Sequence, residues 1–343
     1  MLIAGDIGGT KTDLAIYSCE SGPHTPLAQT EVRSADHPSL QAMVKEFLAQ
    51  VKMSVDVASF DVAGPVINGR VKTTNLPWTL DEETLATDLD LKAAHLMNDL
   101  EAVARAVPAL RAEDMITVNK GQPIESGPIA IIAPGTGLGE SFLTRDGSEY
   151  IAHSSEGGHA DFAPTDERQI RLLRYLLPRF GHVGVERVCS GIGIPNIYGF
   201  LRDEEQIPER TEISQRIASA KDHTKAIVEA AFHPQYPSEL CVATVELFVS
   251  ILASEAGNLA LKVLATGGVY LAGGVALHVA QLLQTPRFVE TFNRKGRFKE
   301  LMERMPIHII TTRAALLGAA TFGLQSLSNL NRREETEASL APV

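Results

Sequence analysis

The chain has 343 residues, 44% of them hydrophobic, and a formal net charge of −11, a composition typical of a globular protein large enough for two domains. No apolar stretch approaches the ~20 residues of a membrane span, and the N-terminus lacks the basic segment of a signal peptide. The acidic charge argues against a nucleic-acid partner, because such proteins usually carry a basic patch. Cys19, Cys189 and Cys241 form neither a disulfide framework nor a thiolate metal site, which fits a reducing cytoplasm.

The chain begins with an apolar strand, a carboxylate and a glycine turn before a second apolar run, all within residues 2–17. The turn offers backbone N–H groups, hydroxyls and an ammonium group from Gly8, Gly9, Thr10, Lys11 and Thr12. Gly8 and Gly9 can adopt positive φ, and their N–H groups can bind an anion without any side chain. Asp6 beside the turn could hold a cation or its water shell, as a metal–nucleotide complex needs. An ordinary hairpin also explains this segment taken alone.

Residues 5–12 differ by one residue from a Walker P-loop, a different kind of phosphate site. Thr10 stands where that loop needs its second glycine. The P-loop also leads directly into a helix, whereas residues 13–17 predict a strand. We therefore expect a strand, a glycine turn and a second strand.

Hydrophobic periodicity predicts the elements further along the chain. We expect strands at 55–63, 70–74, 94–97, 129–133 and 269–272, helices at 100–107, 239–264 and 313–327, and a hairpin turning at 146–147. Pro108 ends the first of these helices, and residues 109–113 connect two domains. This alternation predicts two α/β domains around a cleft. Their expected bounds are 1–109 with 312–328 returning, then 110–311, followed by a frayed polar tail at 329–343.

Two more glycine segments follow predicted strands. The first, residues 133–139, has a Gly-x-Gly-x-Gly pattern, but a Rossmann site would need a helix after it. Gly135, Thr136 and Gly137 therefore predict a second phosphate site, and two such turns support a nucleotide far better than one. Gly273 and Gly274 would let an adenine ring lie against the backbone, although a tight strand-to-helix turn explains them equally well.

Several polar residues are candidates for binding a second substrate. Asp99 either caps a helix or takes a proton from a substrate hydroxyl, and the neighbouring Asn98 can donate to or accept from other hydroxyls. Glu156 and His159 have metal-motif spacing, but the two glycines between them disfavour a helix and no third ligand follows, which favours binding of a polar ligand from a loop. Two weaker candidates are Glu186, which an exposed ion pair explains equally well, and Asn75 near Trp78, which could reach a sugar.

Six motifs, in this order, resemble the zinc-free bacterial glucokinases of the hexokinase, actin and chaperone-ATPase superfamily. They are Asp-Ile-Gly-Gly-Thr, Asn-Asp-Leu-Glu-Ala-Val, Ala-Pro-Gly-Thr-Gly-Leu-Gly, Glu-Gly-Gly-His-Ala-Asp-Phe-Ala-Pro, Glu-Arg-Val-Cys-Ser-Gly and Leu-Ala-Gly-Gly, and the similarity runs from Asp6 to about Leu324. The related repressor/ORF/kinase family has a cysteine-rich zinc motif after the histidine, which is missing after His159. Some members of the zinc-free group carry Asn at the position of Lys11, so the resemblance does not assign its phosphate contact.

The resemblance implies two ribonuclease-H-like domains that close over glucose, and phosphorylation of the glucose 6-hydroxyl as the first step of glycolysis. It implies MgATP between the glycine turns, with Asp6 holding Mg²⁺ through water. The implied sugar-binding residues are Asn98, Asp99, Glu156, His159 and Glu186, with Asp99 as the base. Homodimers are common in that family, so a homodimer is also expected.

Other functions remain as alternatives on the sequence. A kinase for fructose, mannose or N-acetylmannosamine would share these motifs. An ATP-driven chaperone or filament protein would need a peptide-binding domain or polymer contacts, and a sugar-responsive repressor would need a DNA-binding segment. We expect neither, because the first strand starts at Leu2 and the chain ends about where the second domain should end.

Overall fold

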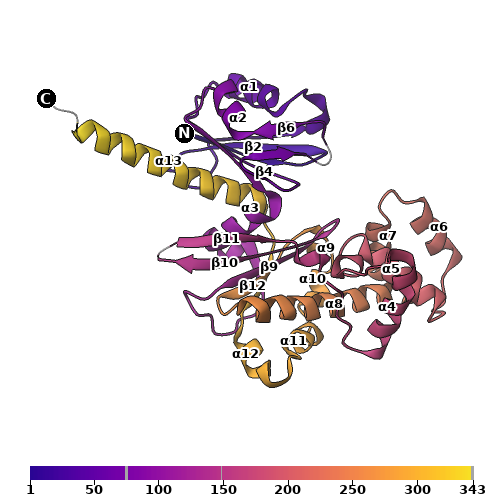
Figure 1. Ribbon diagram of the computed structural model, residues 1–343. Coiled ribbons are helices and arrows are strands. Elements are labelled where there is room, and N and C mark those ends of the chain that lie inside the picture. Colours follow the sequence, from indigo (N-terminus) through magenta and orange to yellow (C-terminus); the bar gives the residue numbers. More distant parts are fainter. Residues whose placement is uncertain (74–75, 148, 341–343) are drawn as a thin grey trace. The chain divides into compact units, whose positions relative to one another are not determined.

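The computed structural model describes residues 1–73, 76–147 and 149–340, and the chain divides into two compact units (Figure 1). Unit 1 comprises Met1–Arg111 and Thr312–Val343, and unit 2 comprises Ala112–Thr311. The chain therefore leaves unit 1 once and returns to it with its last helix.

Unit 1 is built on a five-stranded sheet in the order β3-β2-β1-β4-β7. Its elements are β1 (Leu2–Ile7), β2 (Lys11–Tyr17), β3 (Ala28–Arg33), η1 (Ser34–Asp36), α1 (Leu40–Val51), β4 (Val57–Val62), β5 (Arg70–Lys72), β6 (Thr79–Asp81), α2 (Glu82–Asp88), β7 (Ala93–Asn98), α3 (Asp99–Ala106), η2 (Val107–Ala109) and α13 (Ala314–Leu340). β1 and β2 form an antiparallel hairpin, while β4 and β7 run parallel to β1. The predicted strand–turn–strand is confirmed, and no helix follows the first turn as a P-loop would require.

The two faces of this sheet are buried by different helices, because side chains alternate along each strand. Ile3 and Ile7 face the core formed with α1 and α2, whereas Leu2 packs with α13 on the other face. Figure 1 shows α1 and α2 on one side of the sheet and α13 on the other. α13 also packs closely on α3, since a Cβ at Gly318 would lie 1.7 Å from the carbonyl oxygen of Ala102.

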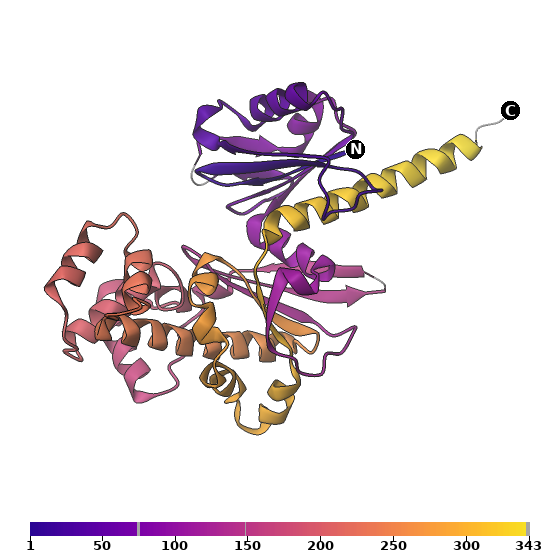
Figure 2. The ribbon, with the colours of Figure 1, turned by 180° about the vertical axis from the view of Figure 1, so that it is seen from behind.

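The last helix is longer than the sequence pattern predicted. The expected helix ended at residue 327 and was followed by a frayed tail, but α13 continues to Leu340. Residues 329–340 lack apolar periodicity, yet they include several Glu and Arg residues, which readily extend a helix already fixed by packing. Lys92 Nζ also donates to Glu334 at 2.7 Å. Figure 2 shows this part of α13 extending beyond the edge of the sheet.

Unit 2 is built on a six-stranded sheet in the order β11-β10-β9-β12-β13-β8. Its elements are η3 (Ala112–Asp114), β8 (Met115–Asn119), β9 (Ile129–Pro134), β10 (Leu138–Asp146), β11 (Glu149–Ser155), η4 (Gly157–His159), α4 (Glu167–Phe180), η5 (Val185–Arg187), α5 (Gly193–Asp203), α6 (Thr211–Ser219), α7 (His223–Ala231), α8 (Glu239–Val263), β12 (Gly268–Leu271), α9 (Gly274–His278), α10 (Ala280–Leu283), α11 (Pro286–Asn293), η6 (Gly296–Phe298), α12 (Lys299–Arg304) and β13 (Ile307–Ile310). β9, β10 and β11 form an antiparallel meander, and β12 is parallel to β9 and β13. The strands predicted at 129–133 and 269–272 are confirmed as β9 and β12.

α8 is the central helix of unit 2 and is apolar on nearly all sides. Its length and composition would allow it to cross a membrane, although 78% of its most apolar window is buried inside the unit. Phe248 and Leu252 are fully buried there. A helix that is hydrophobic all round is expected at the centre of a large core, so its apolar character is explained by packing.

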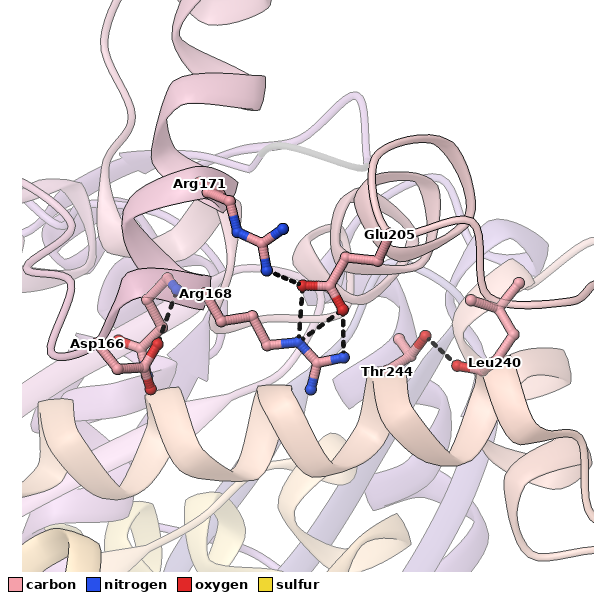
Figure 3. Close-up of polar contacts among 7 residues, drawn as sticks. Asp166, Arg168, Arg171, Glu205, Leu240 and Thr244 are labelled. Carbon is pink, nitrogen blue, oxygen red and sulfur yellow. Dashed lines mark hydrogen bonds and ion pairs between the residues drawn. The ribbon is translucent and has the colours of Figure 1, made fainter.

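α4 is fastened to the segment that follows α5 through one carboxylate. Glu205 accepts hydrogen bonds from Arg168 Nε at 3.0 Å and from Arg171 at 2.7 Å (Figure 3). Asp166 caps the start of α4 by accepting from the backbone N–H of Gln169 at 2.9 Å. These charge-assisted contacts join α4 to the segment that follows α5.

Candidate functional site

The first glycine turn, in unit 1, is a tight hairpin. The N–H of Gly8 donates to the Lys11 carbonyl at 3.0 Å, and a Cβ at Gly8 would lie 2.5 Å from that oxygen. Ser34, which directly follows β3, donates its hydroxyl to the Gly8 carbonyl at 2.6 Å and so stabilises the turn. Neither Gly8 nor Gly9 adopts positive φ. The close approach to Lys11, rather than a left-handed backbone, is what requires glycine at position 8.

The side chains of this turn are not all free to meet a ligand. Lys11 Nζ forms an ion pair with Glu31 on the neighbouring strand. The buried Thr12 hydroxyl lies 3.0 Å from Ser34 Oγ, so it supports the turn. Thr10 remains exposed. In this structure the backbone and Thr10 are therefore better placed than Lys11 to bind an anion at the turn.

A row of four carboxylates crosses the sheet of unit 1 beside this turn. Glu31, Asp13, Asp6 and Asp61 are register partners on β3, β2, β1 and β4. Arg313, the residue before α13, donates to Asp13 at 2.6 Å and to Glu31 at 3.2 Å. The outer half of the row is thereby neutralised, whereas Asp6 and Asp61 have no hydrogen bond to this arginine.

Asp6 and Asp61 are consequently a pair of acidic groups whose pKa values are both raised. Burial is the main cause that raises the pKa of Asp6, and the charges of Asp13 and Asp99 add to it, while the Asp61 carboxyl opposes the shift. Asp61 is fully buried, and burial followed by the charge of Asp6 raises its pKa well above the usual value. Neither Asp61 oxygen has a hydrogen bond of normal geometry among the described residues. The sequence prediction missed Asp61, whose only signal was an aspartate inside the apolar strand 57–62.

Asn98 and Asp99 lie where β7 ends and α3 begins. Asn98 is the helix cap: its Oδ1 accepts from the N–H of Leu100 at 2.9 Å, and its Nδ2 donates to the Gly64 carbonyl at 3.1 Å. Asp99 Oδ1 also accepts from Leu100 at 2.8 Å, but its side chain stays exposed. Desolvation by the surrounding protein raises the pKa of Asp99. Because Asn98 supplies the cap, capping alone does not account for Asp99.

The second glycine turn, in unit 2, connects β9 and β10 and is held by backbone bonds. The N–H of Gly135 donates to the Gly137 carbonyl at 2.9 Å, and the Gly135 carbonyl accepts from Gly191 at 2.8 Å. Glu186 Oε2 accepts from the N–H of Leu138 at 3.0 Å, and a Cβ at Gly137 would lie 2.4 Å from the same oxygen. Glu186, which the sequence could not distinguish from a surface ion-pair residue, therefore closes the second turn. Thr136 is exposed at its tip.

The segment from Glu156 to His159, called the glycine-pair loop below, lies directly on β10. A Cβ at Gly158 would lie 2.1 Å from the Leu138 carbonyl oxygen, and a Cβ at Gly157 would lie 2.0 Å from a carboxylate oxygen of β10. The two glycines therefore allow the loop to approach the strand. Glu156 and His159 point to solvent, with Oε2 and Nε2 3.8 Å apart. The segment contains a single 3₁₀ turn and no α-helix, as its two glycines led us to expect, and binding of a polar ligand there stays a prediction.

The remaining predicted site residues have different outcomes. Gly273 has a φ of 87°, a Cβ on it would lie 2.6 Å from the Pro134 carbonyl oxygen, and α9 begins at Gly274. This confirms a strand-to-helix turn, and an adenine contact there stays a prediction. Asn75 lies outside the described residues. Trp78 belongs to the core of unit 1, with 5% of its surface exposed.

Substitution of Gly158 by alanine tests whether the glycine-pair loop binds substrate. The added Cβ meets the backbone of Leu138, which cannot rotate away, so the loop must lift from β10. A displacement of about 1 Å at a binding group can reduce activity roughly 100-fold. We expect the KM of the substrate that the loop binds to rise roughly tenfold or more. The unfolding temperature, measured in parallel, should fall, because overpacking of this kind costs about 1–3 kcal/mol. An unchanged KM in a variant that is still folded at the assay temperature would remove the loop from the site.

Comparisons with known proteins place these features in context. The Glucokinase family model matches residues 3–326. A glucokinase from Trichormus variabilis is 41% identical, over 93% of this chain and 98% of its own length. A crystal structure of glucokinase from an Antarctic psychrotroph has a TM-score of 0.83 and 30% identity, covering 94% of this chain and 98% of that chain. A ROK family glucokinase from Streptomyces griseus, solved with glucose and AMPPNP, shares the fold with a TM-score of 0.60 at 18% identity, covering 94% of this chain and 99% of that chain. The resemblance drawn from the six motifs is confirmed, as is the two-domain α/β fold it implied.

Proposed function

The chain belongs to the glucokinase family, and we propose that it transfers the γ-phosphoryl group of ATP to the 6-hydroxyl of D-glucose, giving glucose 6-phosphate and ADP. The observation that carries the assignment of roles is Asp99. Its carboxylate is exposed at the start of α3, has a raised pKa and is not needed as the helix cap. A carboxylate of this kind suits a general base that takes the proton of a hydroxyl nucleophile.

Phosphoryl transfer depends mainly on positioning and on charge neutralisation. In the proposal, backbone N–H groups and hydroxyls hold the phosphates at the two turns, Gly8–Thr10 and Gly135–Gly137. Lys11 would contribute only after separating from Glu31. Gly273 and Gly274 would lie against the adenine ring. Asp99 would orient the 6-hydroxyl and accept its proton.

The remaining glucose hydroxyls are assigned in the proposal to five polar side chains. Glu156 and His159 are exposed on the glycine-pair loop and have free hydrogen-bonding capacity. Glu186 retains one carboxylate oxygen beyond its bond to Leu138. Asn98 would bind glucose alongside its capping role, and Asn75 completes the proposed set. A site that hydrogen-bonds hydroxyls rejects analogues that lack them, because its polar groups are then left unpaired.

Asp6 and Asp61 fit a magnesium ion, which when bound would neutralise charge on the phosphates. Mg²⁺ is usually held by one or two carboxylates, with water and substrate phosphate completing its shell. No group of three His, Cys, Asp or Glu residues suited to a metal exists in the described part of the chain, which agrees with such a sparse protein contribution. Asp6 is the more accessible of the two and is assigned the contact, through water.

The wider cellular assignments are also proposals. We expect a cytoplasmic homodimer without nucleic-acid or membrane partners. The acidic charge of −11 supports the absence of a nucleic-acid partner, and burial of the one helix among the described residues that is long and apolar enough to span a bilayer supports the absence of a membrane partner. The homodimer and the cytoplasmic location rest on the family alone.

A substrate panel at fixed ATP tests the choice of sugar. Glucose should be phosphorylated with a kcat/KM at least about tenfold above those of mannose and fructose, because one unpaired buried hydrogen-bonding group is worth about 1–3 kcal/mol. N-acetylmannosamine belongs in the same panel. A higher kcat/KM for any of these three sugars would reassign the chain to a different hexose.

A further inference from the structure

Glu140 is a buried carboxyl group that the proposed reaction does not use. It is 1% exposed, and its Oε1 has no hydrogen-bond partner among the described residues. It lies on β10 in register with Ile132 of β9 and Ser155 of β11. Leaving a polar group buried and unpaired is unfavourable, so its presence on a central strand calls for a physical explanation.

The glycine-pair loop covers this carboxyl group. A Cβ at Gly157 would lie 2.0 Å from Glu140 Oε2 and 2.8 Å from its Cδ, so the group sits directly beneath that residue. The N–H of Gly157 is already used, since it donates to Ser155 Oγ at 3.0 Å. Glu140 therefore contacts the loop by packing, and any change in its charge or hydration acts on the backbone between Glu156 and His159.

Among the described residues, no cation forms an ion pair with Glu140. Glu255 of α8 is 5% exposed and is held by Lys262 at 3.5 Å and by Asn258 at 3.0 Å. The fully buried Cys189 also faces this pair of carboxyl groups. Burial, and then the charge of Glu255, raises the pKa of Glu140 to about 7, with Lys262 opposing the shift. On the loop above, Glu156 and His159 are the ionisable groups.

We propose that Glu140 is a positioning residue for the glycine-pair loop: its neutral carboxyl packs beneath Gly157, and its ionised form draws in water and displaces the loop. The inference rests on the proposed function, because it takes Glu156 and His159 as glucose ligands. It adds a control on glucose affinity that lies below the binding surface and touches no substrate.

The proposal predicts how glucose affinity changes with pH. If glucose binds better when Glu140 is neutral, then bound glucose must raise the pKa of Glu140, because the coupling is reciprocal. The glucose KM should therefore rise between pH 6 and pH 8.5, by roughly three- to tenfold for a coupling of half to one pKa unit. The KM of ATP and the value of kcat should not follow this rise.

The experiment compares Glu140→Gln with Glu149→Gln, which removes an exposed carboxylate at the far end of the same hairpin. Glu140→Gln should abolish the pH-dependent rise of the glucose KM, and Glu149→Gln should keep it. A rise of equal size in both variants would overturn the proposal. Glu140→Leu, which is also uncharged, serves if the glutamine variant does not fold.

Thermal unfolding gives a second readout that does not depend on activity. The folded-state pKa of Glu140 lies above its unfolded value of 4.5, so the folded chain binds more protons between these values and loses stability as pH rises through this window. Glu140→Gln should therefore unfold at a higher temperature than the unmodified chain at pH 8, but not at pH 5. Equal shifts at both pH values would contradict a buried ionisable group.

The variant His159→Ala separates the proposed glucose-binding role of the loop from the proposed positioning role of Glu140. If His159→Ala leaves the glucose KM unchanged, the glucose-binding role of the loop fails. If it raises the KM while Glu140→Gln has no effect, only the positioning role of Glu140 is rejected.

Discussion

Replacing Asp99 with asparagine should lower kcat for glucose phosphorylation by roughly 10²–10⁴-fold, the usual contribution of a general acid or base. Asparagine keeps the side-chain volume, and its carbonyl oxygen can still accept from the N–H of Leu100. Asn98 continues to cap α3. The unfolding temperature and the glucose KM should therefore change little, and steady-state kinetics with calorimetry measure both.

Glu101→Gln is the matched control for this change. Glu101 lies two residues further along α3 and pairs with Arg105 at 2.7 Å, as a partly buried i,i+4 ion pair on the helix. Loss of this ion pair should leave kcat within about twofold of the unmodified value, since such a pair is worth only ~0.3–0.5 kcal/mol.

The raised pKa of Asp99 further predicts that kcat falls as pH is lowered through that pKa, where the base becomes protonated. An Asp99→Asn variant with near-normal kcat would remove the proposed base.

Substitution of Gly318 by alanine should destabilise unit 1 and impair the same reaction. The new Cβ would lie 1.7 Å from the Ala102 carbonyl oxygen, a backbone atom of α3. Overpacking of this kind costs about 1–3 kcal/mol, and more where neither backbone can yield. Because α3 carries Asp99 at its start, separation of the two helices also moves the proposed base.

The single tryptophan makes this effect measurable in one unit. Trp78 is buried in the core of unit 1, so its fluorescence follows the unfolding of that unit in urea. Gly199→Ala in α5 provides the control, because its Cβ would meet only the hydroxyl end of the Tyr175 side chain at 3.3 Å. Because α5 belongs to unit 2, this variant should leave the unfolding curve measured by Trp78 unchanged. Equal stability of Gly318→Ala and the unmodified chain would contradict the helix contact.

The parts of the site that the sequence predicted are those whose chemistry is local. Asp6 with its turn, the pair Asn98-Asp99, and the loop between Glu156 and His159 each carry their signal within a few consecutive residues. Strand alternation and glycine placement were enough to predict the β1–β2 and β9–β10 turns. The Walker and Rossmann alternatives failed on the same local ground, because no helix follows either turn.

The residues that the sequence did not predict depend on contacts between distant segments. Asp61 becomes a partner of Asp6 only through the parallel register of β1 and β4. Arg313 contacts Asp13 from 300 positions away. The proposed role of Glu140 depends on the loop that covers it, which no local pattern shows. In the same way, Gly158 is required by the carbonyl of Leu138, which a pattern of consecutive residues cannot reveal.

The most direct test of the central assignment is to identify the product formed by the purified chain from glucose, ATP and Mg²⁺. Enzymatic detection specific for glucose 6-phosphate, run beside a measurement of ADP, should give equal amounts of both products for the unmodified chain. Asp99→Asn should form both at a rate lower by roughly 10²–10⁴-fold. ADP released without glucose 6-phosphate, or a phosphate found on another hydroxyl, would contradict the assignment of the chain as a glucose 6-kinase.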